Sequence, residues 1–243
     1  MTAIKTEKLT KVYGEKTVVD GIDFEVNEGE LVSLLGVNGA GKTTTIKMLS
    51  CLTSITSGEA YMKGYSVKDE PFKVKKIINV SPQETAVAPK LTVRENLELI
   101  SEIYGFKRED AKSSCDKIIK ELSLSEVENK KARVLSGGYQ RKLSIAMALI
   151  TEPEILFLDE PTLGLDVIAR RELWNFIKSL KGKMTIILTT HYLEEAEHLS
   201  DKVAVMSGGK IVASGTPDEI KSFAGTDSFE DAFIKLSTQG AIK

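Results

Sequence analysis

The sequence predicts an α/β fold, because short apolar strands alternate with helix-compatible segments and a glycine-rich turn joins one strand directly to a helix. Such alternation is typical of strands that lie side by side in a parallel sheet with helices on its faces. The expected buried strands are 31–35, 77–80, 155–160 and 184–190, and the best-defined helices are 44–52, 109–122 and 170–180.

The glycine-rich turn, GVNGAGKTT at 36–44, fits the G-x-x-x-x-G-K-[ST] pattern of a phosphate-binding loop. Its glycines let backbone N–H groups turn toward phosphate oxygens, and the helix that follows adds the positive end of its dipole. Lys42 is placed to reach the β- and γ-phosphates, and the Thr43 hydroxyl to ligate Mg²⁺. A turn without ligand is the alternative, but strand, loop, Lys-Thr and helix in this order favour a nucleoside triphosphate site. The expected nucleotide contacts are Gly36, Asn38, Gly39, Ala40, Gly41, Lys42, Thr43 and Thr44.

The composition is that of an ordinary globular protein of 243 residues, long enough for one large domain or two small ones. The 33 Lys and Arg nearly balance 35 Asp and Glu, so the net charge of −2 gives no electrostatic reason to expect nucleic acid as a partner. No apolar run approaches the roughly 18–20 residues that cross a bilayer, and the start lacks a signal-peptide core. The two cysteines have no metal-type spacing. We therefore expect a cytosolic protein whose contact with a membrane comes through a partner.

The segment before the phosphate loop, 4–26, alternates in short pieces around a Gly-containing turn and predicts antiparallel strands packed on the nucleotide domain. Tyr13 at a strand end either stacks on adenine or serves packing. A second hairpin is expected at 57–67, with Gly58 and Gly64 at turns. Gln83, just after the 77–80 strand, either ligates Mg²⁺ through its carbonyl or is a polar loop residue.

Residues 84–133 are charged and helix-forming, and they predict a helical subdomain inserted into the α/β core. Thr92 and Glu95 form the pattern of a capping box that starts one helix. Ser136 is a good N-cap for the next helix, and Gly137 and Gly138 leave its first N–H groups uncovered. This N-terminus is either a second anion site or an ordinary capped helix.

Asp159 and Glu160 end the 155–160 strand and indicate catalysis, because two adjacent carboxylates at the carboxyl edge of a parallel sheet can take two different roles. Asp159 can hold Mg²⁺ through water, and Glu160 can orient or deprotonate the attacking water. A structural role for both is the alternative. His191 ends the 184–190 strand and could bond to the γ-phosphate or the water, although a histidine at a strand end is often unremarkable. A hairpin at 203–214 and a short helical tail at 216–243 complete the chain.

The phosphate loop, Gln83, LSGGY at 135–139, LFLDEPTLGLD at 156–166 and TTH at 189–191, in this order, resemble the nucleotide-binding subunits of ABC transporters. The resemblance covers residues 4–215. It implies a P-loop NTPase (RecA-like) core with an antiparallel β subdomain, an α-helical subdomain inserted at about 84–150, an ABC ATPase domain over 1–215 and a helical tail over 216–243. By this resemblance Tyr13 stacks on adenine, and Gln83 contacts Mg²⁺ and couples to the membrane subunit.

The resemblance also assigns roles to the later motifs. Ser136, Gly137 and Gly138 would bind the γ-phosphate of the nucleotide held by the opposite subunit. Asp159 corresponds to the Walker B aspartate and Glu160 to the catalytic glutamate. Asp166 corresponds to the D-loop, and His191 to the switch histidine.

Tyr139 departs from the usual LSGGQ signature at the fifth position. We expect the chemistry to survive, because the serine hydroxyl and glycine amides make the phosphate contacts. LSGGYQRKLSIAMAL, DEPTLGLD and THYLEEAE are most similar to exporters of the ABC-2 class and the A-subfamily lipid transporters.

The predicted function is therefore an ATP- and Mg²⁺-dependent ATPase that forms a homodimer or heterodimer around two ATP molecules and drives a separate membrane permease from the cytoplasmic face. The finer pattern favours export. An importer ATPase is the nearest alternative, followed by a soluble non-transport ABC protein acting on ribosomes or DNA, and by a small-molecule kinase.

Overall fold

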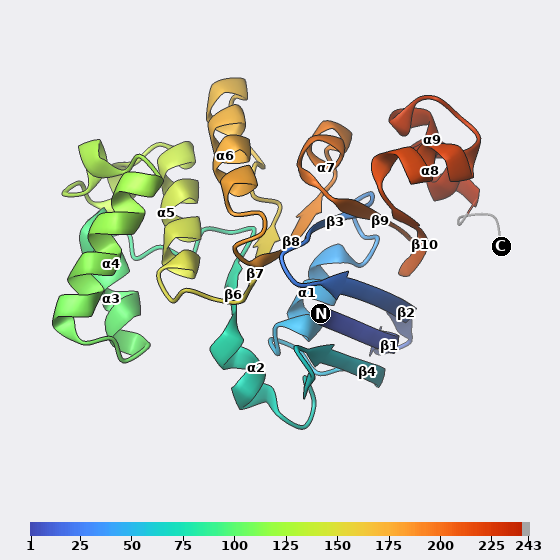
Figure 1. Ribbon diagram of the computed structural model, residues 1–243, viewed down its shortest axis with the longest axis horizontal. Helices are drawn as coiled ribbons and strands as arrows, with labels where there is room; N and C mark the ends of the chain where they lie inside the picture. Colours follow the sequence, from blue (N-terminus) through green and yellow to red (C-terminus); the bar gives the residue numbers. More distant parts are fainter. Residues whose placement is uncertain (240–243) are drawn as a thin grey trace.

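Two β-sheets organise the protein, a large one of mainly parallel strands and a small antiparallel one (Figure 1). The computed structural model describes residues 1–239. In the large sheet the strand order is β10-β9-β3-β8-β7-β6, and only β10 runs antiparallel to its neighbour. Its strands are β3 (Leu31–Leu35), β6 (Ile78–Ser81), β7 (Ile155–Asp159), β8 (Thr185–Thr190), β9 (Lys202–Ser207) and β10 (Lys210–Gly215). The predicted α/β class is confirmed.

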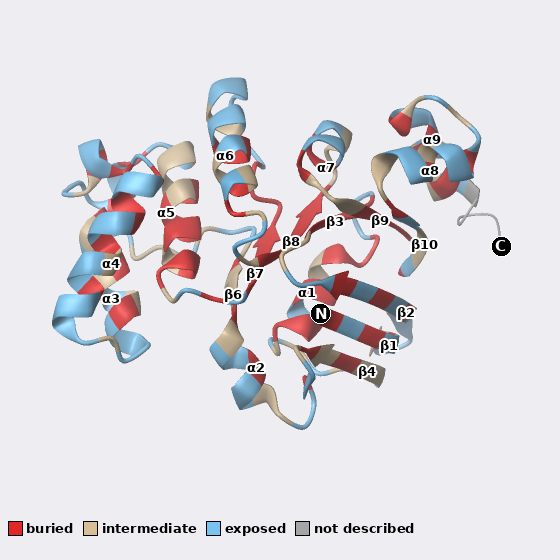
Figure 2. Ribbon diagram, viewed as in Figure 1, coloured by how far each residue is buried: buried red, intermediate tan, exposed pale blue. Residues whose placement is uncertain are grey.

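The inner strands of the large sheet are buried on both faces (Figure 2). Successive side chains of a strand point to opposite sides, so Leu156 and Leu158 of β7 join the core on one face, while Ile155 and Phe157 join the core on the other. This is why the inner strands read as continuous apolar runs rather than as alternating ones.

The small sheet covers one face of the large sheet, with α1 (Lys42–Leu49) packed into the core that the two sheets share. It has the order β2-β1-β4-β5, built from β1 (Thr2–Tyr13), β2 (Lys16–Asn27), β4 (Ser57–Met62) and β5 (Tyr65–Ser66). The predicted place of Gly58 was wrong, because it lies inside β4 rather than at a turn. The register of β1 against β4 shifts there, and Gly58 has a φ of +80° with an added Cβ only 2.1 Å from the Lys8 carbonyl oxygen.

The opposite face of the large sheet carries the helical region, whose outer helices α3 and α4 lie far from the small sheet in Figure 1. The Thr92–Glu95 capping box is formed as predicted. The helical region contains α3 (Val93–Ile103), α4 (Arg108–Glu121), the 3₁₀ turns η1 (Ser125–Val127) and η2 (Ala132–Val134), α5 (Gly137–Leu149) and α6 (Val167–Ser179). Helix α2 (Pro71–Ile77), which leads into β6, packs instead into the core shared with the small sheet, through Val74 and Ile77.

The C-terminal segment packs against the sheet edge rather than trailing from it. It contains α8 (Pro217–Ala224) and α9 (Phe229–Gln239), which share a core with α7 (Leu193–Leu199), β9 and β10. The part of the predicted tail at 240–243 lies outside the described residues. Among residues 1–239, every helix is too short or too polar to cross a membrane.

Two helices begin earlier than the sequence pattern predicted, because each starts directly after its N-cap residue, Gly41 or Asp166. The helix expected from residue 44 begins at Lys42, after Gly41 in the left-handed conformation. The helix expected from residue 170 begins at Val167, where the Asp166 carboxylate accepts hydrogen bonds from the N–H groups of Ile168 and Ala169.

Candidate active site

The phosphate loop, residues 36–44 between β3 and α1, has a backbone that only glycine permits at three positions. Gly39 and Gly41 have φ angles of +84° and +105°, in the left-handed region. A Cβ on Gly36 would lie 2.5 Å from the Met206 carbonyl oxygen, and one on Gly41 would lie 2.8 Å from that of Val18. The glycines therefore set both the curl of the loop and its contact with the neighbouring strands.

Lys42 holds its ammonium group inside this loop. Its Nζ donates to the carbonyl oxygens of Gly36 at 2.7 Å and Val37 at 3.3 Å, and lies 3.5 Å from Glu160 Oε1. The side chain is only 6% exposed. A lysine held in this way places a fixed positive charge where the loop N–H groups gather, which suits a phosphate group.

Thr43 and Asp159 bring two oxygen ligands together at the mouth of the phosphate loop. Thr43 Oγ1 donates to Asp159 Oδ1 at 3.1 Å, and the same carboxylate oxygen accepts a bond from the hydroxyl of Thr189 on the adjacent strand. Hydroxyl and carboxylate oxygens are the hard ligands that Mg²⁺ prefers, and Mg²⁺ takes its remaining ligands from water and phosphate. The donor set therefore fits a magnesium ion, which Thr43 and Asp159 would help to hold.

Glu160 lies between Lys42 and His191, one residue beyond the end of β7. His191 Nδ1 is 2.7 Å from Glu160 Oε2, and the Glu160 side chain is 6% exposed. Its φ is +49°, which is rare for a residue with a side chain and costs on the order of 1–3 kcal/mol. The strained turn breaks away from the strand and directs the Glu160 carboxylate toward Lys42 of the phosphate loop.

A cavity of about 400 Å³ joins these groups. It brings together the phosphate loop, Gln83, Glu160 and His191, which are far apart in the sequence. Its full lining is Val18, Asn38, Gly39, Ala40, Gly41, Lys42, Thr43, Thr44, Gln83, Glu160, Leu163 and His191.

Tyr13 and the signature residues lie outside this lining. The Tyr13 ring is 48% exposed, 4.8 Å from Lys11 Nζ, and its hydroxyl is 3.4 Å from Thr53 Oγ1. Ser136 and Gly137 begin α5 at an exposed position, where Ser136 Oγ accepts the N–H of Tyr139 at 3.5 Å. Asp166 caps α6.

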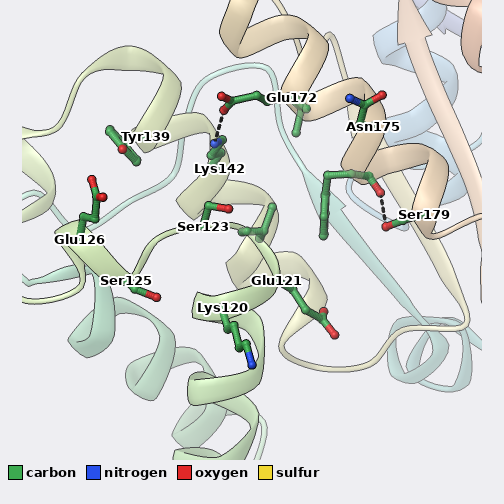
Figure 3. Close-up of a pocket in the computed structure, with 13 residues that line it drawn as sticks. Lys120, Glu121, Ser123, Ser125, Glu126, Tyr139, Lys142, Glu172, Asn175 and Ser179 are labelled. Atoms are coloured by element: carbon green, nitrogen blue, oxygen red, sulfur yellow. Dashed lines mark hydrogen bonds and ion pairs between the residues drawn. The ribbon is translucent and has the colours of Figure 1, made fainter.

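Tyr139 lies in a separate groove of about 750 Å³ between α4, α5 and α6 (Figure 3). Its ring is 5.7 Å from Lys142 Nζ, and Lys142 pairs with Glu172 of α6 at 2.9 Å. The departure from the usual signature therefore lies on the flank of α5, while the Ser136 hydroxyl and the first amides of the helix remain at its exposed end.

Two residues that hold the site were missed by the sequence reasoning. Thr189 bonds to both Asp159 and the Glu160 N–H, and Arg141 of α5 bonds to carbonyl oxygens beside Glu160. Thr189 is opposite Asp159 in the β7–β8 register, which no local pattern reveals. Arg141 offered one signal, a charged residue two positions before the apolar part of α5.

The fold and site together define a P-loop nucleoside triphosphatase, with a phosphate loop and the Glu160–His191 pair in one cavity and the Thr43–Asp159 oxygen pair at the loop. The particular family follows from comparison with known proteins. Residues 19–163 match the ABC transporter family model, and the chain belongs to this family.

Similar proteins and structures agree with this family. The daunorubicin resistance ATP-binding protein DrrA3 of Streptomyces coeruleorubidus is 39% identical over 99% of this chain and 76% of its own length. The linearmycin resistance ATP-binding protein LnrL of Bacillus subtilis is 38% identical over 98% and 75%. A solved ATP-binding subunit of an ABC transporter has a TM-score of 0.87 at 30% identity, covering 97% of this chain and all of that one. A dimeric post-hydrolysis cassette bound to ADP and Pi has a TM-score of 0.79 at 28% identity, over 88% and 98%.

The predicted family, fold class and enzyme class are thus confirmed. The chain is an ATP-binding and ATP-hydrolysing subunit of the ABC transporter family.

Proposed function

We propose that this chain is the ATPase subunit of an ABC exporter that moves amphipathic drug-like or lipid-like molecules. The observation that carries the catalytic part is the placement of Glu160 between Lys42 and His191, next to the Thr43–Asp159 corner. Relatives named for resistance to daunorubicin and linearmycin support export over import, because removing a toxic compound from the cell confers resistance.

Each site residue has a proposed role in hydrolysis. Glu160 orients the attacking water and accepts its proton, and His191 holds the Glu160 carboxylate and reaches the γ-phosphate. Lys42 neutralises the β- and γ-phosphates. Mg²⁺ is held by Thr43, Asp159 and Gln83, and supplies charge neutralisation between the phosphates when bound.

The remaining nucleotide contacts come from the rest of the phosphate loop and from two groups outside the cavity lining, Tyr13 and the start of α5. The phosphate loop residues Asn38, Ala40 and Thr44 give backbone or hydroxyl contacts to the phosphates, and Tyr13 stacks on the adenine, its exposed ring being free to receive a base. The exposed start of α5, with Ser136, offers uncovered amides to an anion on another molecule.

A second ATPase subunit would complete the site. In this proposal Ser136, Gly137 and Gly138 bind the γ-phosphate of a nucleotide held by the partner, and Asp166 lies at the same interface. The partner is either a second copy of this chain or a related ATPase. Because each ATP is shared by two subunits, ATP binding closes the dimer and hydrolysis loosens it.

Closure would act on a separate membrane permease at the cytoplasmic face. We propose that the permease docks at 83–96, beside a small cavity of about 160 Å³ lined by apolar residues that include Pro82, Ile100, Tyr104 and Met147. In this view, residues 84–150 move as a subdomain against the rest of 1–215, and no nucleic acid takes part. Helices α8 and α9 of the expected tail move with 1–215, because they share a core with α7 and β9.

The experiment is a pair of variants measured by ATP turnover and by size-exclusion elution with and without ATP. Glu160→Gln should bind ATP, form an ATP-dependent dimer and hydrolyse at least about a hundredfold more slowly. Lys42→Ala should lose both ATP binding and dimer formation. Wild-type turnover in Glu160→Gln would remove the proposed role of this carboxylate, and undiminished binding in Lys42→Ala would remove the phosphate loop assignment.

A further inference from the structure

Arg141, in the second turn of α5, is a buried cation whose hydrogen bonds all go to backbone carbonyl oxygens. The side chain is 3% exposed. Arginine is almost never buried to this extent without partners that satisfy its five N–H donors. The hydrogen-bond partners of Arg141 therefore indicate its role.

Two of its bonds hold the turn that contains Glu160. Nη2 donates to the Asp159 carbonyl oxygen at 2.7 Å and Nε to that of Pro161 at 2.8 Å. These carbonyl groups lie immediately before and after Glu160, the residue with the left-handed backbone. A strained conformation persists only where its surroundings determine it from several sides. Nη1 donates to the Pro82 carbonyl oxygen at 2.5 Å, after the end of β6.

The same guanidinium nitrogen also reaches the loop that carries Gln83. Nη1 lies 3.3 Å from the Gln83 carbonyl oxygen. One planar side chain thus joins three segments, namely the end of β6, the end of β7 and helix α5, whose first turn follows Ser136. A guanidinium can do this because its donors point in fixed, divergent directions, whereas a lysine ammonium is a single point.

The charge of Arg141 fits this position. Burial lowers the pKa of the guanidinium to about 10, while the neighbouring carboxylates of Asp159, Glu195 and Glu160 oppose that shift. The group therefore stays cationic at neutral pH. It places a buried positive charge near the two active-site carboxylates, Asp159 and Glu160.

We propose that Arg141 is a positioning residue that locks the Glu160 turn and the Gln83 loop to helix α5. It does not line the nucleotide cavity, so it acts through the groups it holds. Any displacement of α5, whose N-terminus is the proposed γ-phosphate site of the opposite nucleotide, is passed to Glu160 and Gln83 together. This inference rests on the proposed function, since it needs Glu160 to be catalytic.

The test separates positioning from binding. Arg141→Met keeps the length and apolar stem of the side chain but removes every donor. We expect kcat to fall by about tenfold or more, because small displacements of catalytic groups have effects of that size. The Kd for ATP, measured by equilibrium binding without turnover, should change by less than about threefold. Arg141→Lys should show the same split, because one ammonium cannot reach all the carbonyl groups.

Lys181→Met is the matched control. Lys181 Nζ pairs with Asp201 at 2.7 Å, donates to the Leu199 carbonyl oxygen at 3.0 Å and lies outside the lining of the nucleotide cavity. Its loss should lower the melting temperature and leave kcat and Kd within about twofold of the wild type. It therefore reports what loss of a cation bonded to the backbone does by stability alone.

The outcomes are decisive in both directions. Wild-type kcat in folded Arg141→Met overturns the inference, and so does a loss of ATP affinity as large as the loss of kcat. Should Arg141→Met fail to fold, the same two criteria apply to Arg141→Lys. Glu160→Gln is assayed alongside: if it keeps wild-type turnover, the proposed function has failed, whereas an inactive Glu160→Gln with a fully active Arg141→Met removes only the role of Arg141.

Discussion

Thr189→Val removes a hydroxyl that holds the Asp159 carboxylate, with almost no change in side-chain volume. Thr189 is fully buried. Its Oγ1 donates to Asp159 Oδ1 and accepts the Glu160 N–H at 3.0 Å. The Glu160 N–H also reaches the Thr189 carbonyl oxygen at 3.1 Å, so this donor keeps a partner in the variant. The net loss is one hydrogen bond to a carboxylate.

A hydrogen bond to a charged group contributes about 1.5–3 kcal/mol to folding. We therefore expect urea unfolding of the nucleotide-free variant to give a free energy of unfolding lower by that amount. Asp159 would also lose part of the scaffold that orients it toward Mg²⁺, and loss of such a supporting group typically weakens metal affinity by about 10–100-fold. A Mg²⁺ titration of ATP hydrolysis measures this shift directly.

Thr185→Val is the control, because it makes the same change on the same strand, away from the site. Thr185 is buried, and its hydroxyl accepts the Gly29 N–H at 3.1 Å. This variant should lose stability without any shift in Mg²⁺ dependence. An unshifted Mg²⁺ titration in Thr189→Val would refute the claim that Thr189 holds the metal-facing carboxylate.

Two further predictions follow from backbone geometry and from burial. Gly41→Ala should abolish ATP binding and lower the melting temperature, because φ is +105° and the new Cβ would lie 2.8 Å from the Val18 carbonyl oxygen; calorimetric titration with ATP showing normal affinity would contradict this. Burial raises the pKa of Glu195 above the ordinary glutamate value of about 4.5. The folded state therefore binds a proton more tightly than the unfolded chain, and the free energy of unfolding falls as pH rises from about 4.5 through the raised pKa. Glu195→Gln keeps an oxygen for the Thr162 and Trp174 donors and should remove this fall, as urea unfolding across pH 4.5–8 would measure; a slope equal to that of the wild type would count against it.

Some elements were predictable because their determinants are contiguous. The phosphate loop is a run of nine residues in which glycine spacing, lysine and threonine each have a local geometric reason. The capping box likewise needs only Thr92 and Glu95, three residues apart on the same turn. The apolar runs that became β3, β7 and β8 are visible because both faces of those strands are buried.

Other features were hidden because they depend on which strands and helices become neighbours. The sequence presents 216–243 as a short tail, and only the packing of α8 and α9 on β9 and β10 makes it part of the core. The sequence pattern predicts a turn at Gly58, but glycine is required there because a Cβ would collide with the Lys8 carbonyl oxygen on another strand.

The triphosphate site and the likeness to ABC ATPases can be recognised in the sequence, since the motifs that carry the chemistry are each encoded in one short stretch. How those stretches support one another depends on the folded arrangement. Thr189 meets Asp159 through parallel strand pairing across 30 residues, and Arg141 meets Glu160's flanking carbonyls because α5 packs at the end of β7. Such contacts form between side chains of separate helices and strands in a buried space. Local sequence periodicity and motif spacing therefore do not predict them.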